Sequence, residues 1–297
     1  MILPPFLQAG DRIGIIAPAR KVQRGEATKA AAIFQSWGLE PVFGKNLFGE
    51  DHQFSGTDEE RAQDLHSFLM DDSIKAIISF RGGYGSVRLM PHLADSYPTP
   101  KWLIGYSDFT VIHTWANQRL GWASIHATMP VNMVMEGEYR QLSNLSLKNA
   151  LFGKPESLPI PFHTLEKKGE SKGQLCGGNL SVLFSLLGSN LQLETQEKLL
   201  FLEDLDEYLY HVDRMMQAIK RARILDAAKA IVVGGMSDMR DNAIPFGHSA
   251  EEIIASTCSD LNKPLRYGLE SGHLPLNRAL IFGLDYELKE DLLRPLL

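Results

Sequence analysis

The chain has 297 residues, of which 44% are hydrophobic and 22% are charged, and its formal net charge is −6. This length fits one large or two ordinary domains, and the composition excludes disordered and fibrous classes. The acidic balance argues against a nucleic-acid partner or an anionic membrane surface. No apolar run approaches the roughly 18 residues of a membrane span, and the N-terminus lacks the basic start of a signal peptide. With only two cysteines, we expect a soluble cytoplasmic protein with reduced thiols.

The first half of the chain alternates short apolar runs with longer amphipathic stretches, which indicates an α/β fold. Thr57 and Glu60 form a capping box at the start of one predicted helix. Near-continuous apolar strands predict a parallel sheet covered on both faces. The predicted strands cover residues 12–17, 40–43, 76–80, 102–105 and 123–126, and the predicted helices cover 25–37, 58–70 and a stretch ending near 120.

The second half repeats this alternation after a segment of different character. Residues 153–169 contain three prolines and no sustained periodicity, which predicts an interdomain connection. We therefore predict a first domain at 1–152, a linker at 153–169 and a second α/β domain at 170–297. The second domain's predicted strands cover 173–176, 198–202, 230–233, 264–267 and 278–282, and its predicted helices cover 180–187, 212–223 and a segment from 249.

Polar groups lie at the carboxyl ends of predicted strands, where open α/β sheets bind ligands, in three segments: 81–85, 105–108 and 202–204. Residues 81–85 (RGGYG) hold three glycines, whose backbone N–H groups either cradle an anion or only form a turn. The second segment, 105–108 (GYSD), leads a strand straight into a helix. This is the form of a nucleophile elbow without the second glycine of G-x-S-x-G. Alternatively, Ser107 or Asp108 is a simple helix N-cap.

Acidic and histidine residues offer candidates for proton transfer. Glu203 and Asp204 follow an apolar strand, where an acid either orients a catalytic histidine or caps a loop. His273 lies in a loop flanked by glycine and proline, and functional residues concentrate in such loops. Cys176 is expected to be a small buried residue rather than a nucleophile. No motif has metal-ligand spacing, so we expect no metal.

Taken together, these segments resemble the serine L,D-carboxypeptidase family, muropeptide carboxypeptidases that are related to microcin-immunity peptidases. Each motif is short, but they occur in the family's order and span nearly the whole chain, which makes the resemblance specific. The matching segments are GDRIGIIAPA at 10–19, SFRGGYGSVR at 79–88, IGYSD at 104–108, CGGNL at 176–180, FLEDLDE at 201–207 and GHL at 272–274.

The resemblance implies a flavodoxin-like parallel-sheet domain followed by a swivelling β/β/α-like domain. It also implies a triad in which Ser107 is the nucleophile, Glu203 the acid and His273 the base, in a site between the two domains. Backbone N–H groups of Gly83 and Asp108 match the family's oxyanion hole. No metal or organic cofactor is implied.

For function, the resemblance implies removal of the terminal D-alanine from a cytoplasmic murein tetrapeptide during wall recycling. Arg81 is a candidate partner for the carboxylate of the leaving group, and Asn179 for the substrate backbone. A homodimer is expected from the habit of the family. One alternative is a microcin-immunity-type peptidase that cleaves aminoacyl-nucleotide conjugates. The resemblance gives such proteins an aromatic loop near the site, whereas residues 153–176 contain no tryptophan. The other is a non-catalytic flavodoxin-like binding protein that holds a phosphate at residues 82–85.

Overall fold

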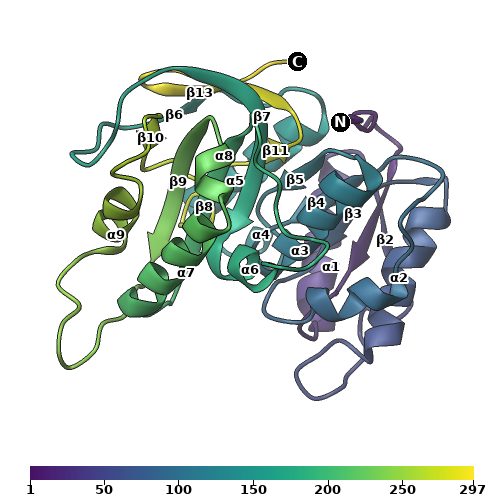
Figure 1. The fold of residues 1–297 in the computed structure, drawn as a ribbon. Helices are drawn as coiled ribbons and strands as arrows, with labels where there is room; N and C mark the ends of the chain where they lie inside the picture. Colours follow the sequence, from purple (N-terminus) through teal and green to yellow (C-terminus); the bar gives the residue numbers. More distant parts are fainter. The chain divides into compact units, whose positions relative to one another are not determined.

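The computed structural model describes all 297 residues, which form two compact units (Figure 1). The first unit comprises Met1–Pro155 with Leu276–Gly283, and the second comprises Glu156–Pro275 with Leu284–Leu297. Each unit is built on one β-sheet, so the predicted α/β class with a parallel N-terminal sheet is confirmed. The units differ from the predicted domains in two places. Most of the predicted linker belongs to the second unit, and the segment from 276 to 283 returns to the first.

The first unit has a six-stranded sheet in the order β11-β5-β4-β3-β1-β2. All neighbouring pairs are parallel except that of β11 with β5. The strand order reverses beside β1, so the loops after β1 and β3 flank a switch point of the kind where open sheets bind ligands. The strands are β1 Arg12–Ile16, β2 Glu40–Phe43, β3 Ile74–Ser79, β4 Trp102–Gly105, β5 Ser124–His126 and β11 Leu280–Phe282.

The helices of this unit form two groups, within each of which neighbouring helices contact one another. Right-handed crossovers place the two groups on opposite faces of the sheet. One group holds α1 Arg24–Ser36, α4 Pro130–Met133 and α5 Glu138–Leu151; the other holds α2 Asp58–Met70, the 3₁₀ helices η1 Ser86–His92 and η2 Ser107–Phe109, and α3 Thr110–Trp115 with its π-helical extension η3 Ala116–Leu120.

The predicted capping box at the start of α2 is confirmed. The Thr57 hydroxyl accepts the Glu60 N–H at 3.3 Å, and the Thr57 N–H donates to the Glu60 carboxylate at 2.9 Å. Phe68 of α2 packs against Gly14 of β1, where a Cβ atom would lie 2.4 Å from the ring. This contact fixes α2 on its face of the sheet.

The second unit has a seven-stranded sheet in the order β10-β9-β8-β7-β12-β13-β6. Its first four strands are parallel, and β12, β13 and β6 are added antiparallel. The carboxyl ends of β7, β8 and β9 therefore meet at one edge. The strands are β6 Leu158–Pro159, β7 Ser171–Asn179, β8 Leu199–Leu205, β9 Ala230–Ser237, β10 Leu265–Arg266, β12 Asp285–Leu288 and β13 Leu292–Pro295.

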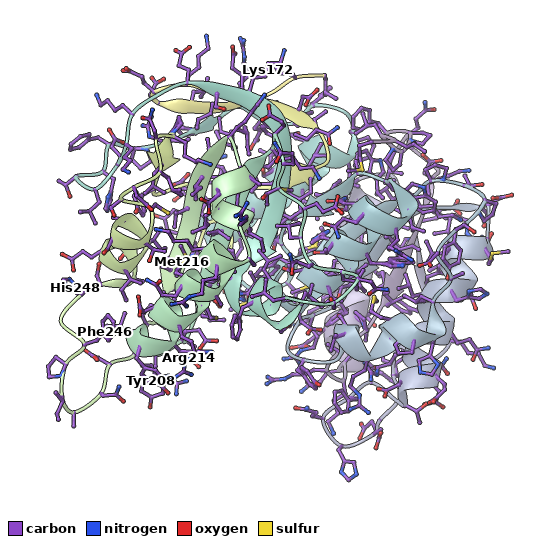
Figure 2. All side chains as sticks on the ribbon, viewed as in Figure 1. Lys172, Tyr208, Arg214, Met216, Phe246 and His248 are labelled. Carbon is purple, nitrogen blue, oxygen red and sulfur yellow. The ribbon has the colours of Figure 1, made fainter.

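Helix α7 supplies much of the apolar core on this sheet (Figure 2). Its residues Val212, Met215, Met216 and Ile219 are buried, as their helical spacing predicts, while Arg214 points outward. The helices of the unit are α6 Leu180–Ser185, α7 Leu209–Arg221, α8 Ile224–Ala227 and α9 Ala250–Thr257. No helix in either unit combines the length and the apolar character needed to cross a bilayer.

Helix α5 and the strands β12 and β13 are absent from the sequence-based prediction. The inward face of α5 carries Ser143 and Ser146, which hides its amphipathic pattern. These serine hydroxyls accept the N–H groups of Asn277 at 2.9 Å and Ala279 at 3.0 Å. The polar face of α5 therefore anchors the segment that returns to form β11.

The contact between Phe68 and Gly14 makes a stability prediction. Gly14→Ala should lower the free energy of unfolding by about 1–3 kcal/mol, because the new methyl group meets the ring with no space to move. Denaturant unfolding measures this change, and Gly14→Ala combined with Phe68→Leu should recover part of it. Gly25→Ala is the matched control, since nothing lies within 4 Å of its Cβ and alanine favours helix α1. An equal loss in the control would contradict the packing explanation.

Candidate active site

Ser107 occupies a strained turn directly after β4. Its φ is +65°, a left-handed conformation that non-glycine residues adopt at a cost of about 1–3 kcal/mol. Phe109 stands where G-x-S-x-G has its second glycine, and its ring packs on Gly105, whose Cβ would lie 2.6 Å from Cγ of the ring. The side chain of neither Ser107 nor Asp108 caps η2 or α3, because Tyr106 and Phe109 are the N-cap residues. The turn has the geometry of a nucleophile elbow.

The glycine loop after β3 lies against this turn. A Cβ at Gly82 would be 3.2 Å from the Ser107 hydroxyl oxygen. Gly83 has a φ of +123° and is covered by Arg20, whose side chain would be 2.7 Å from a Cβ there. The positive φ favours glycine at this position, and any side chain there would also have to displace Arg20. The loop can therefore present backbone N–H groups next to Ser107.

A buried histidine, His113, binds the backbone just before the Ser107 turn. His113 of α3 contacts the Gly105 carbonyl through Nε2 at 2.9 Å and the Ser124 hydroxyl through Nδ1 at 2.9 Å. A neutral ring that donates from Nε2 and accepts at Nδ1 satisfies both contacts. Burial lowers the pKa of His113 to about 4, so the ring stays neutral near pH 7.

In the second unit, the structure brings Glu203 and His273 together. Glu203 lies near the carboxyl end of β8, opposite Asn179 of β7, and its side chain is fully buried. Its Oε2 atom accepts the Nδ1–H of His273 at 2.6 Å and the backbone N–H of His273 at 3.1 Å. This pair of contacts fixes both the tautomer and the orientation of the imidazole ring.

The loop that carries His273 is held by hydrogen bonds and by close packing against Glu203. Gly272 has a φ of +99°, and a Cβ there would lie 2.6 Å from Oε2 of Glu203. The Ser237 hydroxyl donates to the carbonyl of His273, and the Gly235 N–H donates to Ser271 at 3.1 Å. Burial alone would lower the pKa of His273, but the charge and hydrogen bond of Glu203 outweigh it and the pKa is raised.

A second buried carboxylate, Asp204, lies beside the pair. It accepts the side-chain amide of Asn179 at 2.8 Å and the N–H of Ser181 at 2.8 Å. Burial, reinforced by the charge of Glu203, raises the pKa of Asp204 to about 7. The carbonyl oxygen of the Asn179 side chain caps α6 through the Val182 N–H. Asn179 thus holds Asp204 and the helix start, and its contact with substrate stays a prediction.

Two further residues singled out in the sequence are Arg81 and Cys176. The Arg81 guanidinium donates a long hydrogen bond, 3.4 Å, to the Lys21 carbonyl, and its role toward a carboxylate stays a prediction. Cys176 is buried, as expected, and burial raises the pKa of its thiol to about 12, which makes it a poor nucleophile. The sequence does not single out His113, which binds the Gly105 carbonyl, or Arg61, which donates to the Gly85 carbonyl. A single arginine or histidine on an amphipathic helix carries no local signal of its contacts.

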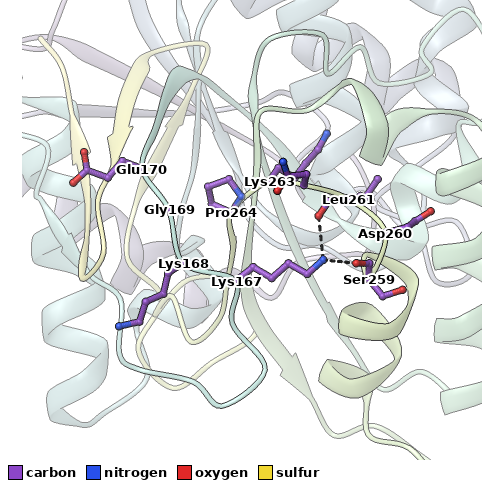
Figure 3. Close-up of a pocket in the computed structure, with 10 residues that line it drawn as sticks. Lys167, Lys168, Gly169, Glu170, Ser259, Asp260, Leu261, Lys263 and Pro264 are labelled. Atoms are coloured by element: carbon purple, nitrogen blue, oxygen red, sulfur yellow. Dashed lines mark hydrogen bonds between the residues drawn. The ribbon is translucent and has the colours of Figure 1, made fainter.

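A pocket of about 440 Å³ lies elsewhere in the second unit (Figure 3). Residues 167–170 and 259–264 line it, and they precede β7 and β10, so the pocket is at the amino edge of the sheet. Lys167 donates to the carbonyls of Cys258, Ser259 and Leu261, which ends α9. The pocket is thus remote from the strand ends that carry Glu203. No group of three or more metal-binding side chains occurs in the structure.

The first unit thus holds a serine in the turn typical of a nucleophile elbow, and the second unit holds a histidine oriented by a buried carboxylate. Both arrangements are typical of hydrolases. Comparison with known families agrees. Residues 13–127 match the LD-carboxypeptidase N-terminal domain, and residues 172–288 match the LD-carboxypeptidase C-terminal domain. The chain belongs to the LD-carboxypeptidase family and is a serine carboxypeptidase.

Individual relatives cover nearly the whole chain. A probable murein peptide carboxypeptidase of Bacillus subtilis is 32% identical, over 94% of this chain and 89% of its own. The murein tetrapeptide carboxypeptidase of Pseudomonas aeruginosa is 29% identical, over 95% and 94%. The fold matches that of the microcin C7 self-immunity protein in complex with aspartyl sulfamoyl adenosine, with a TM-score of 0.87, 21% identity and coverage of 100% and 99%.

The contact between Glu203 and His273 predicts a pH effect on activity. A histidine that acts as a general base must be neutral, and Glu203 raises the pKa of His273. With His273 as the base, the acid limb of kcat/KM should therefore lie above the ordinary histidine value of 6.5. Glu203→Gln should move that limb to lower pH and reduce kcat by about 10²–10⁴. Glu207→Gln is the control, because Glu207 holds His211 by a similar 2.6 Å contact. An unmoved acid limb in Glu203→Gln would contradict the assignment.

His113 predicts a pH effect on stability. Its pKa is about 4 in the folded protein against 6.5 ordinarily, so the unfolded chain binds more protons between these values. The free energy of unfolding should therefore fall by on the order of 3 kcal/mol as pH drops from 6.5 to 4. His113→Gln, which keeps a donor toward Gly105, should flatten this dependence in denaturant titrations across that range. Parallel curves for variant and wild type would rule out His113 as its source.

Proposed function

We propose that this protein is a serine L,D-carboxypeptidase that removes the terminal D-alanine from murein tetrapeptides, with Ser107, His273 and Glu203 as its triad. The observation that carries the proposal is the Glu203–His273 pair, an imidazole held at Nδ1 by a fully buried carboxylate. The strained turn at Ser107 supplies the matching nucleophile. The names of the relatives support the murein substrate.

Each residue type fits its proposed step. Neutral Ser107 is a weak nucleophile, so Nε2 of His273 accepts its proton as the hydroxyl oxygen attacks the carbonyl carbon of the scissile amide. Glu203 stabilises the resulting imidazolium, which then donates the proton to the nitrogen of the leaving D-alanine. Water attacks the acyl-enzyme with the same histidine as base, releasing the tripeptide and restoring Ser107.

The developing negative charge on the substrate oxygen is the second requirement. We assign the N–H groups of Gly83 and Asp108 to it, since Gly82 lies directly against Ser107 and Asp108 follows it in the chain. Such donors contribute about 10²–10³ in kcat each. Arg81 is proposed to pair with the carboxylate of the terminal residue, and Asn179 to contact the peptide backbone.

The proposed setting is the cytoplasm, where the enzyme would act on murein tetrapeptides during wall recycling. A homodimer remains an expectation from the family. The alternative activity, cleavage of an aminoacyl-nucleotide conjugate, is kept because the self-immunity protein has the same fold. A non-catalytic binding protein would not need the buried Glu203–His273 pair.

Peptide cleavage followed by mass spectrometry tests the proposed function. The purified protein should release D-alanine from L-Ala–D-Glu–diaminopimelate–D-Ala, and Ser107→Ala should lower kcat by roughly 10⁴–10⁶ while the fold is retained. The pentapeptide should react about 10²-fold more slowly, because its scissile bond joins two D-residues and displaces the carbonyl from a fixed triad. An amidated tetrapeptide should also react more slowly, since it cannot pair with a cation.

The outcomes separate the candidates. Equal cleavage of all three peptides would contradict carboxypeptidase specificity. Hydrolysis of aspartyl sulfamoyl adenosine with no peptide cleavage would favour the immunity-type activity. Inertness toward every substrate, or full activity of Ser107→Ala, would contradict the proposed mechanism.

A further inference from the structure

We infer that two buried side chains, Asp108 and Arg61, are positioning residues that clamp the glycine loop against the nucleophile turn and so set the oxyanion-binding N–H of Gly83. The inference rests on the proposed function insofar as an oxyanion forms beside Ser107. It assigns the Asp108 side chain a role separate from that of its backbone N–H.

The carboxylate of Asp108 reaches across from the nucleophile turn to the glycine loop. Its Oδ2 atom accepts the N–H of Ser86 at 2.9 Å, and its Oδ1 atom accepts the N–H of Gly85 at 3.3 Å. Asp108 is only 5% exposed, so water cannot replace these contacts easily. The residue after the nucleophile therefore holds the loop that packs on the nucleophile.

Arg61 holds the same peptide group from the other side. Its Nη1 atom donates to the carbonyl of Gly85 at 3.2 Å and also to the carbonyl of Pro18, in the loop after β1. The side chain is 1% exposed and pairs with Asp58. The peptide group between Gly85 and Ser86 thus has its N–H on Asp108 and its carbonyl on Arg61. It is fixed in both rotation and position.

This double clamp acts where geometry matters most for catalysis. Gly83 is two residues before the clamped peptide, in a stretch between β3 and η1 that has no regular secondary structure to define its path. Oxyanion donors act only when they are held in place before the reaction, and a displacement near 1 Å can cost about 10²-fold in rate. The clamp supplies that rigidity through buried hydrogen bonds, and the Arg61 guanidinium adds a charged donor, which bonds more strongly than a neutral one.

Asp108→Asn tests the clamp, because it keeps the size of the side chain but turns one acceptor into a donor that faces a backbone N–H. We expect kcat for D-alanine release to fall by about 10²-fold, with KM within about threefold of wild type. A fluorophosphonate probe should also label Ser107 about 10²-fold more slowly, since phosphonylation places an oxygen in the same oxyanion site. Arg61→Lys should show the same split between kcat and KM, with a smaller effect.

Asp64→Asn is the matched control. Asp64 is also 5% exposed and also accepts a backbone N–H, that of Asn46 at 3.0 Å, but it holds the loop after β2. This variant should unfold more readily yet keep kcat and the labelling rate of wild type. A similar loss in both aspartate variants would overturn the clamp, because the effect would then be general destabilisation. A kcat and a labelling rate within about threefold of wild type in Asp108→Asn would also overturn it.

Failure of the clamp and failure of the proposed function give different results, because D-alanine release and Ser107 labelling are measured separately. If the wild-type protein releases no D-alanine but its Ser107 is labelled, the proposed substrate is wrong and the labelling rates still decide the clamp. A wild-type protein that neither cleaves nor labels overturns both. If Arg61→Lys does not fold, the comparison of Asp108→Asn with Asp64→Asn decides alone.

Discussion

The left-handed backbone of Ser107 is the constraint on which the first unit's site depends. A serine at φ +65° relaxes unless its neighbours prevent it, and every neighbouring element contributes. Phe109 packs on Gly105, His113 binds the Gly105 carbonyl, and the Asp108 carboxylate ties the turn to the glycine loop. The sheet, α3 and the loop after β3 together hold a conformation that none of them would impose alone.

In the second unit the equivalent constraint is buried negative charge. Glu203 and Asp204 are adjacent and both almost inaccessible to water, which is unfavourable for two ionised carboxylates. The two carboxylates are stabilised by different partners. Glu203 binds His273 and raises its pKa, whereas Asp204 has a pKa raised to about 7 and takes neutral donors from Asn179 and Ser181. Glu203 is therefore the carboxylate that binds the His273 imidazole.

Much of the local structure was predictable from the sequence because its signals are short-range. Apolar runs predicted the parallel strands of both units, and the Thr57 capping box marked the first residue of α2. The run from Gly105 to Asp108 fitted either an elbow or a helix N-cap, and the acids after the apolar strand fitted either a partner for a histidine or a loop cap. Only the resemblance to the family chose between these alternatives. The predictions failed where inward positions are polar, as in α5 with Ser143 and Ser146. There, hydrophobic periodicity is lost although the helix is buried.

The sequence by itself therefore determined the α/β class, the strand-to-helix turn at Ser107 and the candidates Glu203 and His273. Tertiary structure alone decided which of these meet. The 2.6 Å contact between Glu203 and His273 joins residues 70 positions apart, and the Arg61 contact with Gly85 joins residues 24 apart. Likewise, only the tertiary structure shows that the segment 276–283 belongs to the first unit, where its strand β11 joins the sheet. The physical reason is that a buried polar group must find a partner wherever the packed chain provides one, and no local pattern encodes that partner.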